Sequence, residues 1–148
     1  MTNFLSNLAA SPSTTPAPLA PELLWLGLVS ILTGLLWTPY ILNRMREHGA
    51  WPAIHNSEHD PRPRTPWADR LQYAHENAVE NLVVFAALAL AVVVAERGSP
   101  ATAAAAATYF CARLAHVVIY TLGVPVLRTV AFMTGVVAQG VLAVALLS

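Results

Sequence analysis

The sequence predicts an all-α fold, an up-down bundle of four transmembrane helices. Of the 148 residues, 56% are apolar and 11% are charged, whereas about a quarter of an ordinary soluble domain is charged. The mean hydropathy is +0.55. Four long apolar runs cover residues 23–42, 77–95, 101–122 and 129–147. Each run is close to the ~20 residues that a helix needs to cross a hydrocarbon core of about 30 Å, so each is predicted to span the membrane.

This composition excludes several classes of protein. A disordered chain, a disulfide scaffold and a large soluble catalytic domain are excluded, because more than half of the chain would lie in lipid. The eight basic residues are all Arg and are balanced by eight acidic residues, so no positive field attracts nucleic acid. The single Cys111 can form no bridge within the chain. His48, His55 and His59 have neither a nearby Cys nor helical spacing, so no metal site is predicted.

The first 21 residues differ from the rest of the chain. Residues 1–21 are rich in Ser, Thr, Pro and Ala and lack the positively charged start of a signal peptide, so we expect a flexible leader before a transmembrane domain at 22–148. The first apolar run has Trp25 near one end and Trp37 and Tyr40 near the other. Aromatic side chains of this kind favour the two membrane interfaces, which supports a complete span.

The segment between the first two runs is polar. Residues 43–76 are rich in Arg, His, Asp, Glu and Pro, which lipid cannot accommodate, so this segment is predicted to be an aqueous loop. Few helix-breaking residues follow Pro66 and Trp67, and Pro is well tolerated in a first helical turn. We therefore expect the second helix to begin here, before the membrane does.

The arginines predict the orientation of the bundle. Short basic loops stay in the cytoplasm, and acidic residues contribute little to this bias. Segment 43–76 holds five of the eight Arg, the hairpin at 96–100 holds one, and the leader holds none. The long loop is therefore predicted to be cytoplasmic, with both termini outside the cytoplasm. A composition rich in Ala and Pro, with Arg and no Lys, is compatible with a bacterial inner membrane.

Polar residues also occur at membrane depth. A charge there costs at least ~2.5 kcal/mol, so Glu80 and Arg113 need partners. At 100° per residue, four polar residues of the second helix fall within about 80° and four of the third within about 60°. The two stripes are Arg70, Tyr73, Asn77 and Glu80 on the second helix, and Tyr109, Arg113, His116 and Tyr120 on the third.

The two stripes are predicted to face each other. Short connections make consecutive helices antiparallel neighbours, so Glu80 and Arg113 are expected to form a buried pair, and Arg128 at the start of the fourth helix closes the same cavity. Guanidinium groups bind carboxylates through two parallel hydrogen bonds. The cavity is therefore expected to hold an anionic, peptide-like cofactor, while lipid admits an apolar partner.

Two blocks of sequence resemble a known family. Arg70-Leu-Gln-Tyr-Ala-His-Glu-Asn-Ala-Val-Glu-Asn, in the second helix, is similar to the Asn-x-x-Glu signature of the MAPEG family, the membrane-associated proteins in eicosanoid and glutathione metabolism. The block that runs from Arg113 to Arg128 resembles the third helix of that family and the Arg that opens its fourth. Arg44-Met-Arg46 is similar to the basic pair at the end of its first helix. The resemblance covers roughly residues 23–147.

This resemblance implies a homotrimer that binds glutathione between subunits near the cytoplasmic face. Family activities include glutathione conjugation, hydroperoxide reduction, and leukotriene and prostaglandin synthesis. Carried over to this chain, Arg128 is the catalytic residue that stabilises the glutathione thiolate. The implied cofactor-binding residues are Arg44 from an adjacent subunit, Arg70, Tyr73, Asn77, Glu80, Arg113, His116 and Tyr120. Several eicosanoid enzymes have Arg where Tyr73 and Glu76 stand, so this pocket carries less positive charge than theirs.

The predicted function is a membrane transferase or peroxidase that uses glutathione and acts on lipophilic electrophiles. Its predicted partners are membrane lipid, a lipophilic small-molecule substrate and further copies of the chain. An alternative is a non-catalytic lipid-binding scaffold of the same family, and a third possibility is a small transporter subunit. The polar residues also have structural explanations. Asn77, Glu80 and Arg113 can clamp helices together, Arg128 can lie at the interface, and His116 can be a packing residue.

Overall fold

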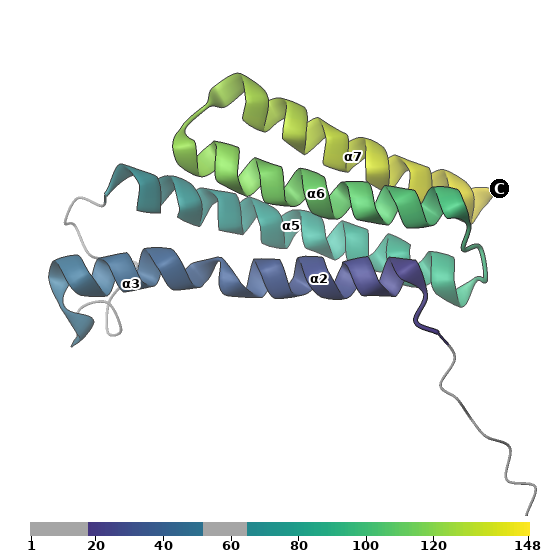
Figure 1. Cartoon of the computed structure of the whole chain (residues 1–148), viewed down its shortest axis with the longest axis horizontal. Coiled ribbons are helices and arrows are strands. Elements are labelled where there is room, and N and C mark those ends of the chain that lie inside the picture. Colours follow the sequence, from purple (N-terminus) through teal and green to yellow (C-terminus); the bar gives the residue numbers. More distant parts are fainter. Residues whose placement is uncertain (1–17, 52–64) are drawn as a thin grey trace, which may run out of the picture.

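The computed structural model describes residues 18–51 and 65–148, and within these ranges the chain is helical, without strands. The helices are α2 (Pro21–Leu35), α3 (Trp37–His48), α5 (Pro66–Val94), α6 (Pro100–Leu122) and α7 (Pro125–Leu147). Figure 1 shows α2 and α3 end to end along one side of the bundle, with α5 and α6 beside them and α7 against α6. Most of the predicted leader, residues 1–17, lies outside the described residues.

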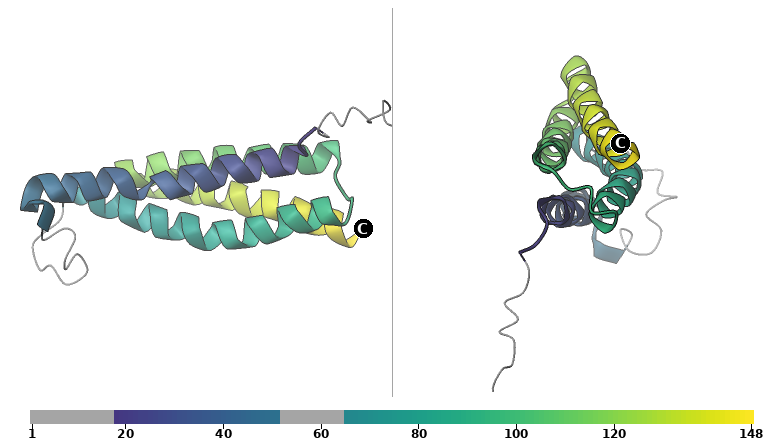
Figure 2. Two further views of the ribbon diagram at one scale, coloured as in Figure 1. Left: turned by 90° about the horizontal axis from the view of Figure 1, so that it is seen from below. Right: turned by 90° about the vertical axis from the view of Figure 1, so that its right-hand side faces the viewer.

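The four predicted spans are confirmed. Four helical segments are long and apolar enough to cross a membrane: Pro21–His48, Pro66–Val94, Pro100–Leu122 and Pro125–Leu147. Successive segments run in opposite directions, as Figures 1 and 2 show. One end of the bundle therefore holds the α6–α7 turn, the end of α3 and the start of α5. The opposite end holds the α5–α6 turn.

Proline begins four of these helices. Pro21, Pro66, Pro100 and Pro125 each stand in the first helical turn, where the missing backbone N–H has no helical partner to lose. The start of α5 at Pro66 agrees with the prediction. At the other end of α6, Gly123 adopts φ +79°, the left-handed conformation that ends a helix and here makes a short turn into α7.

The first span is interrupted between α2 and α3. Pro39 has no N–H to donate to the carbonyl of Leu35, and the N–H of Leu36 bonds instead to Thr33 O, three residues back, at 3.2 Å. The break does not end the span, because α3 continues from Trp37 to His48.

The predicted loop at 43–76 begins too early along the chain. The structure continues α3 through His48 and begins α5 at Pro66, and residues 52–64 are outside the described part of the chain. Polar composition marks where a helix leaves the hydrocarbon, and a helix can extend further into water. The prediction therefore ended the first helical segment too close to the membrane, whereas the start of the second at Pro66 was as predicted.

Small residues allow the helices to pack closely. Ala74, Ala89 and Ala106 are fully buried at helix contacts, and Phe85 stacks on Tyr109 with ring centroids 3.9 Å apart. Without a hydrophobic force between helices in lipid, close packing of this kind provides much of the association energy. One core cluster joins α2, α5, α6 and α7. A second cluster joins α5 and α6, and Tyr40 of α3 packs against it.

A buried carboxylate joins α2 to the α5–α6 turn. Glu22 is 2% exposed and accepts a hydrogen bond from the Thr102 hydroxyl at 2.5 Å. Thr102 also forms a capping box with Ser99 at the start of α6. Gly98 lies beside the carboxylate, since a Cβ there would be in van der Waals contact with Glu22 Oε1 at 3.7 Å. These residues form a clip at the end of the bundle opposite the predicted cavity.

Candidate functional site

The centre of the candidate site is a hydrogen bond between α5 and α6. The Arg113 guanidinium donates through Nη2 to Asn77 Oδ1 at 2.8 Å. Arg113 is 2% exposed, although its helix is one of the membrane spans. This contact confirms that the polar stripes of the second and third helices face each other.

The predicted pair between Glu80 and Arg113 is wrong. Glu80 is exposed, and within residues 18–51 and 65–148 no ion pair joins these two side chains. Along α5, Arg70 and Asn77 differ by about 20° and point toward α6, whereas Tyr73 and Glu80 lie about 60° further round. Tyr73 is accordingly 53% exposed. The stripe therefore divides into an inner and an outer half.

Arg70 caps the end of α6. Its Nε donates to the Thr121 carbonyl at 2.8 Å. An ideal Cβ at Gly123 would lie 3.3 Å from the Arg70 guanidinium carbon, so the absence of a side chain there lets the arginine approach. A cation at this position compensates the free carbonyls and the negative end of the α6 dipole. Arg70 therefore has a structural role, and its role in holding a cofactor stays a prediction.

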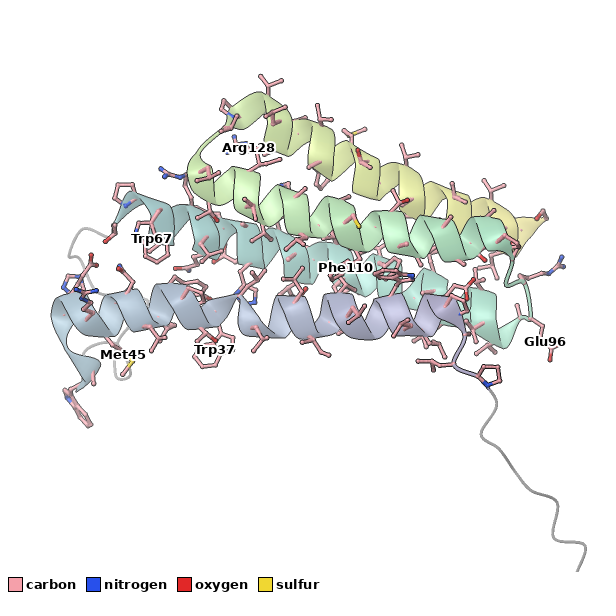
Figure 3. All side chains as sticks on the ribbon, in the orientation of Figure 1. Trp37, Met45, Trp67, Glu96, Phe110 and Arg128 are labelled. Carbon is pink, nitrogen blue, oxygen red and sulfur yellow. The ribbon has the colours of Figure 1, made fainter. Side chains whose placement is uncertain are left out.

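Arg128 joins the polar residues of α6, as predicted. Its guanidinium carbon lies 4.6 Å from the centre of the Tyr120 ring, a cation–π contact. The His116 ring meets Tyr120 edge-on at 5.5 Å and lies 6.1 Å from Phe132. Figure 3 shows Arg128 at the α6–α7 turn, at the end of the bundle away from Glu96. The two helices thus bring an arginine, a tyrosine and a histidine together.

Two buried polar side-chain atoms of this region lack a hydrogen-bond partner. Arg113 Nε and His116 Nδ1 have no hydrogen-bond partner within the described part of the chain, whereas the Tyr109 hydroxyl has the Gln139 side chain beside it. A buried donor or acceptor left in this way costs about 1–3 kcal/mol. Arg113 and His116 therefore keep hydrogen-bonding capacity that the described part of the chain does not use.

Arg44 lies on α3 and is buried within its own chain. Nearby, α3 is fastened to α5 by two contacts that the sequence did not predict. The Tyr40 hydroxyl and His75 Nδ1 are 2.9 Å apart, and Asn43 Nδ2 donates to the Thr65 hydroxyl at 3.1 Å. A contact between Arg44 and a ligand of an adjacent subunit stays a prediction.

Two amide side chains near the centre of the bundle were missed by the sequence reasoning. Gln139 Nε2 of α7 donates to the Asn81 carbonyl at 3.1 Å, and Asn81 Nδ2 donates to the Asn77 carbonyl at 2.9 Å. A signal was available, because Gln139 is an amide inside the fourth apolar run. The criterion that selected Glu80 and Arg113 also applies to it.

The outer face of α5 has a regular pattern. Seven of its exposed residues recur at alternating spacings of three and four, the spacing by which one helix packs along another, and the exposed Val79 and Val84 flank this row. The face is polar toward the α6–α7 turn and apolar toward the other end. It consists of Tyr73, Glu76, Glu80, Val83, Ala87, Leu90 and Val94.

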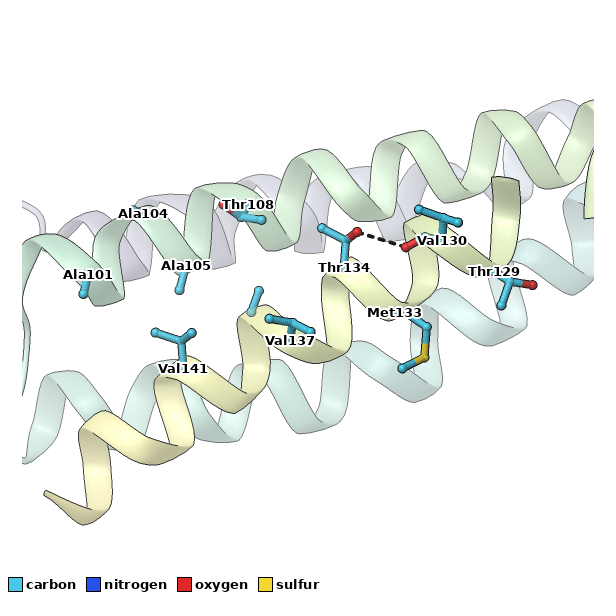
Figure 4. A pocket seen from close by; sticks show the side chains of 11 residues that line it. Ala101, Ala104, Ala105, Thr108, Thr129, Val130, Met133, Thr134, Val137 and Val141 are labelled. Atoms are coloured by element: carbon cyan, nitrogen blue, oxygen red, sulfur yellow. Dashed lines mark hydrogen bonds between the residues drawn. The ribbon is translucent and has the colours of Figure 1, made fainter. Parts of the chain in front are cut away.

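An apolar groove of about 730 Å³ lies between α6 and α7. Figure 4 shows it lined on one side by Ala101 and Ala105 and on the other by Val137 and Val141. The lining extends along α7 to Thr129, the residue after Arg128. The groove is therefore an apolar surface whose end approaches the polar cluster.

Comparison with known proteins agrees with this arrangement. Residues 23–148 match the family model described as MAPEG, a range that contains all four spans apart from the first residues of α2. Comparisons with curated proteins and with solved structures gave no match. The matched range includes both polar blocks and the contact between Arg113 and Asn77. The chain is thus a multi-pass membrane protein that belongs to the MAPEG family.

Proposed function

We propose that the protein is a homotrimeric membrane enzyme that uses glutathione to conjugate or reduce lipophilic electrophiles. The observation that carries the proposal is the Arg113–Asn77 hydrogen bond inside the membrane span of a MAPEG member, beside His116. A guanidinium is expensive to hold in lipid, and such residues are functional by default. Arg113 Nε and His116 Nδ1 have no hydrogen-bond partner within the described residues. This supports a role in ligand binding in addition to a role in holding α5 and α6 together.

The side chains of this region fit the chemistry of glutathione. Its two carboxylates match the guanidinium groups of Arg70 and Arg113, and its amino group matches the Glu80 carboxylate. Asn77 and Tyr120 offer further polar contacts. The residues proposed to hold the tripeptide are Arg44, Arg70, Tyr73, Asn77, Glu80, Arg113, His116 and Tyr120.

The division of the α5 stripe supports a site between subunits. Arg113 and His116 are buried inside the chain, whereas Tyr73 and Glu80 lie on the outer face of α5. A ligand that contacts both sets must lie at the edge of α5. The outer face has the spacing of a helix-packing seam, and a neighbouring subunit there would shelter Glu80 from lipid. A homotrimer provides this neighbour for every protomer.

Arg128 is the proposed catalytic residue. When bound, glutathione supplies a thiol, and its thiolate is the form that attacks an electrophile. An ordinary thiol has a pKa of about 8.5, and a nearby guanidinium favours the thiolate; lowering the thiol pKa by one unit takes about 1.4 kcal/mol. The α6–α7 groove offers an apolar substrate a surface that reaches Thr129, next to Arg128.

The proposed location follows from the arginine-rich segment. With that segment in the cytoplasm, the α6–α7 turn and Arg128 also lie at the cytoplasmic side, where glutathione is available, and both termini lie outside. The Ala-rich composition without Lys fits a bacterial inner membrane.

Titration of glutathione into the detergent-solubilised protein tests the proposal. We expect a saturable thiolate absorbance that appears together with binding. Arg97→Ala is a matched control, because Arg97 is an exposed arginine at the opposite end of the bundle. The absence of both binding and thiolate signal at millimolar glutathione would overturn the enzyme proposal.

A non-catalytic lipid-binding scaffold is the second candidate. The apolar groove of about 730 Å³ favours it, since such a surface in a membrane can hold a lipid chain without any chemistry. Lipid that co-purifies with the protein, together with turnover that Arg128→Ala leaves unchanged, would favour the scaffold over the enzyme.

A further inference from the structure

We propose that Gln139 is a positioning residue for the Arg113–Asn77 pair. Its hydrogen bond to the Asn81 carbonyl holds α7 against α5. The α7 backbone at Gly135 then faces the Arg113 side chain. The geometric part of this proposal concerns the chain alone. Its consequence for ligand binding rests on the proposed use of glutathione.

Gln139 connects α7 to α5 through a polar contact. Its side chain is 9% exposed, and Nε2 donates to Asn81 O at 3.1 Å. Among the residues that the structure describes, this bond joins the Gln139 side chain to α5, and the same side chain also has a hydrogen-bond contact with the Tyr109 side chain of α6. An amide in a membrane helix gains more from such a bond than from lipid, so the bond selects one register of α7.

The bond is made one helical turn from the site. Asn81 Nδ2 donates to the Asn77 carbonyl at 2.9 Å, and the Asn77 side chain accepts from Arg113 at 2.8 Å. Helix α5 is therefore held by α7 at Asn81 and by α6 at Asn77. The two connections are four residues apart on the same side of α5.

Gly135 transmits the position of α7 to Arg113. It precedes Gln139 by one helical turn, and a Cβ built there would lie 3.8 Å from Arg113 Cδ and 3.7 Å from the Tyr109 ring. The α7 backbone at Gly135 thus faces the Arg113 side chain across a space that one methyl group would fill. A displacement of α7 along or around its axis moves this backbone, and Arg113 then loses its alignment with Asn77.

Gln139→Met tests the geometric part of the proposal without any ligand. The variant removes the amide donor with little change in volume, and Gln72→Met makes the same change on a side chain that bonds to Glu76 within α5. The measurement is the hydrogen exchange of the Arg113 guanidinium protons by NMR in detergent or nanodiscs. Gln139→Met should speed this exchange by about tenfold, whereas Gln72→Met should leave it unchanged.

A purely structural role of Gln139 gives a different result. The variant would then lose thermal stability while the Arg113 protons exchange at the wild-type rate, and the proposal would be overturned. If Gln139→Met does not fold, hydrogen exchange of the wild-type protein at increasing temperature tests the positioning role instead. Positioning requires the Gln139 amide protons and the Arg113 protons to lose protection together, and Arg113 opening while Gln139 stays protected contradicts it.

Glutathione kinetics add a second readout. Since Arg113 and Asn77 are proposed to bind the tripeptide and Arg128 to act on the thiol, Gln139→Met should raise KM for glutathione by about fivefold and change kcat by less than about twofold. An equal loss in both constants contradicts positioning of the binding pair. If the wild-type protein binds no glutathione, the proposed function fails, but the exchange result still decides the role of Gln139.

Discussion

The two ends of the bundle bury charged side chains in different ways. At the α5–α6 turn, Glu22 accepts a hydrogen bond from Thr102, which is itself bonded to Ser99, and no atom of these three residues is buried without a partner. Toward the α6–α7 turn, Arg113 is equally buried. It donates one hydrogen bond to Asn77, and its Nε has no hydrogen-bond partner within the described residues. Burial alone therefore does not identify a site. Unused hydrogen-bonding capacity distinguishes the candidate site from the structural clip.

Variants of these two regions should differ in their effects on activity and on stability. Removal of a residue of the candidate site should affect ligand binding or turnover. Removal of a residue of the clip should affect the free energy of unfolding alone.

The largest effect is expected for Arg128→Ala. Loss of the proposed thiolate stabiliser should lower kcat with glutathione by about a hundredfold, comparable to the removal of one donor from an oxyanion hole. Arg128 is partly exposed and its described side-chain contact is with Tyr120, so the fold should persist. Steady-state kinetics with a lipophilic electrophile measure the effect, and Arg97→Ala provides the control. Unchanged kcat in Arg128→Ala would show that the arginine takes no part in the chemistry.

Asn77→Leu should destabilise the centre of the bundle. The change leaves the Arg113 guanidinium without its described acceptor, and a hydrogen bond to a charged group contributes about 1.5–3 kcal/mol to the free energy of unfolding. Unfolding by a denaturing detergent measures this loss, and glutathione affinity should fall in parallel. Asn77→Asp keeps an acceptor and should retain most of the stability. Equal stability of Asn77→Leu and the wild type would mean that the contact contributes nothing.

Glu22→Leu should destabilise the protein by about 1 kcal/mol, the net value of one hydrogen bond. The loss is small because the Thr102 hydroxyl can still donate to the Ser99 carbonyl, 2.8 Å away. Glu22→Gln keeps an oxygen that accepts from Thr102 and should be close to wild type. Both variants should bind glutathione normally. Impaired binding in Glu22→Leu at a temperature where it is folded would contradict the separation of the two ends.

The sequence predicted the parts of this structure that depend on hydropathy and helical period. The four spans, the start of α5 at Pro66 and the facing of the two stripes follow from those two properties. The partner of Arg113 did not follow, because Asn77 and Glu80 differ by only about 60° on the helix. Which of them faces α6 depends on how the neighbouring helix is rotated, and a helical wheel does not contain that information.

The missed residues have a related physical explanation. Glu22 lies at the edge of the first apolar run, where an acidic side chain is normally hydrated, and only the approach of Gly98 and Thr102 buries it. Gln139 bonds to a backbone carbonyl, an acceptor that every residue has, so no side-chain pattern indicates its partner. Contacts of this kind are set by tertiary packing.

Gly123→Ala should lower the free energy of unfolding by about 1 kcal/mol, an effect no larger than that of Glu22→Leu. A side chain at φ +79° is strained, and its Cβ would lie 3.3 Å from the Arg70 guanidinium. Arg70→Ala, which removes the hydrogen bond to Thr121 O and leaves the turn intact, separates the loss of the cap from backbone strain. If Arg70 acts through the end of α6 alone, thermal unfolding of the double variant should show less destabilisation than the sum of the two single changes. Additive losses would mean that Arg70 and Gly123 contribute to stability independently. The stability of the α6–α7 turn would then depend on Gly123 and not on the Arg70 cation, which is also part of the candidate site.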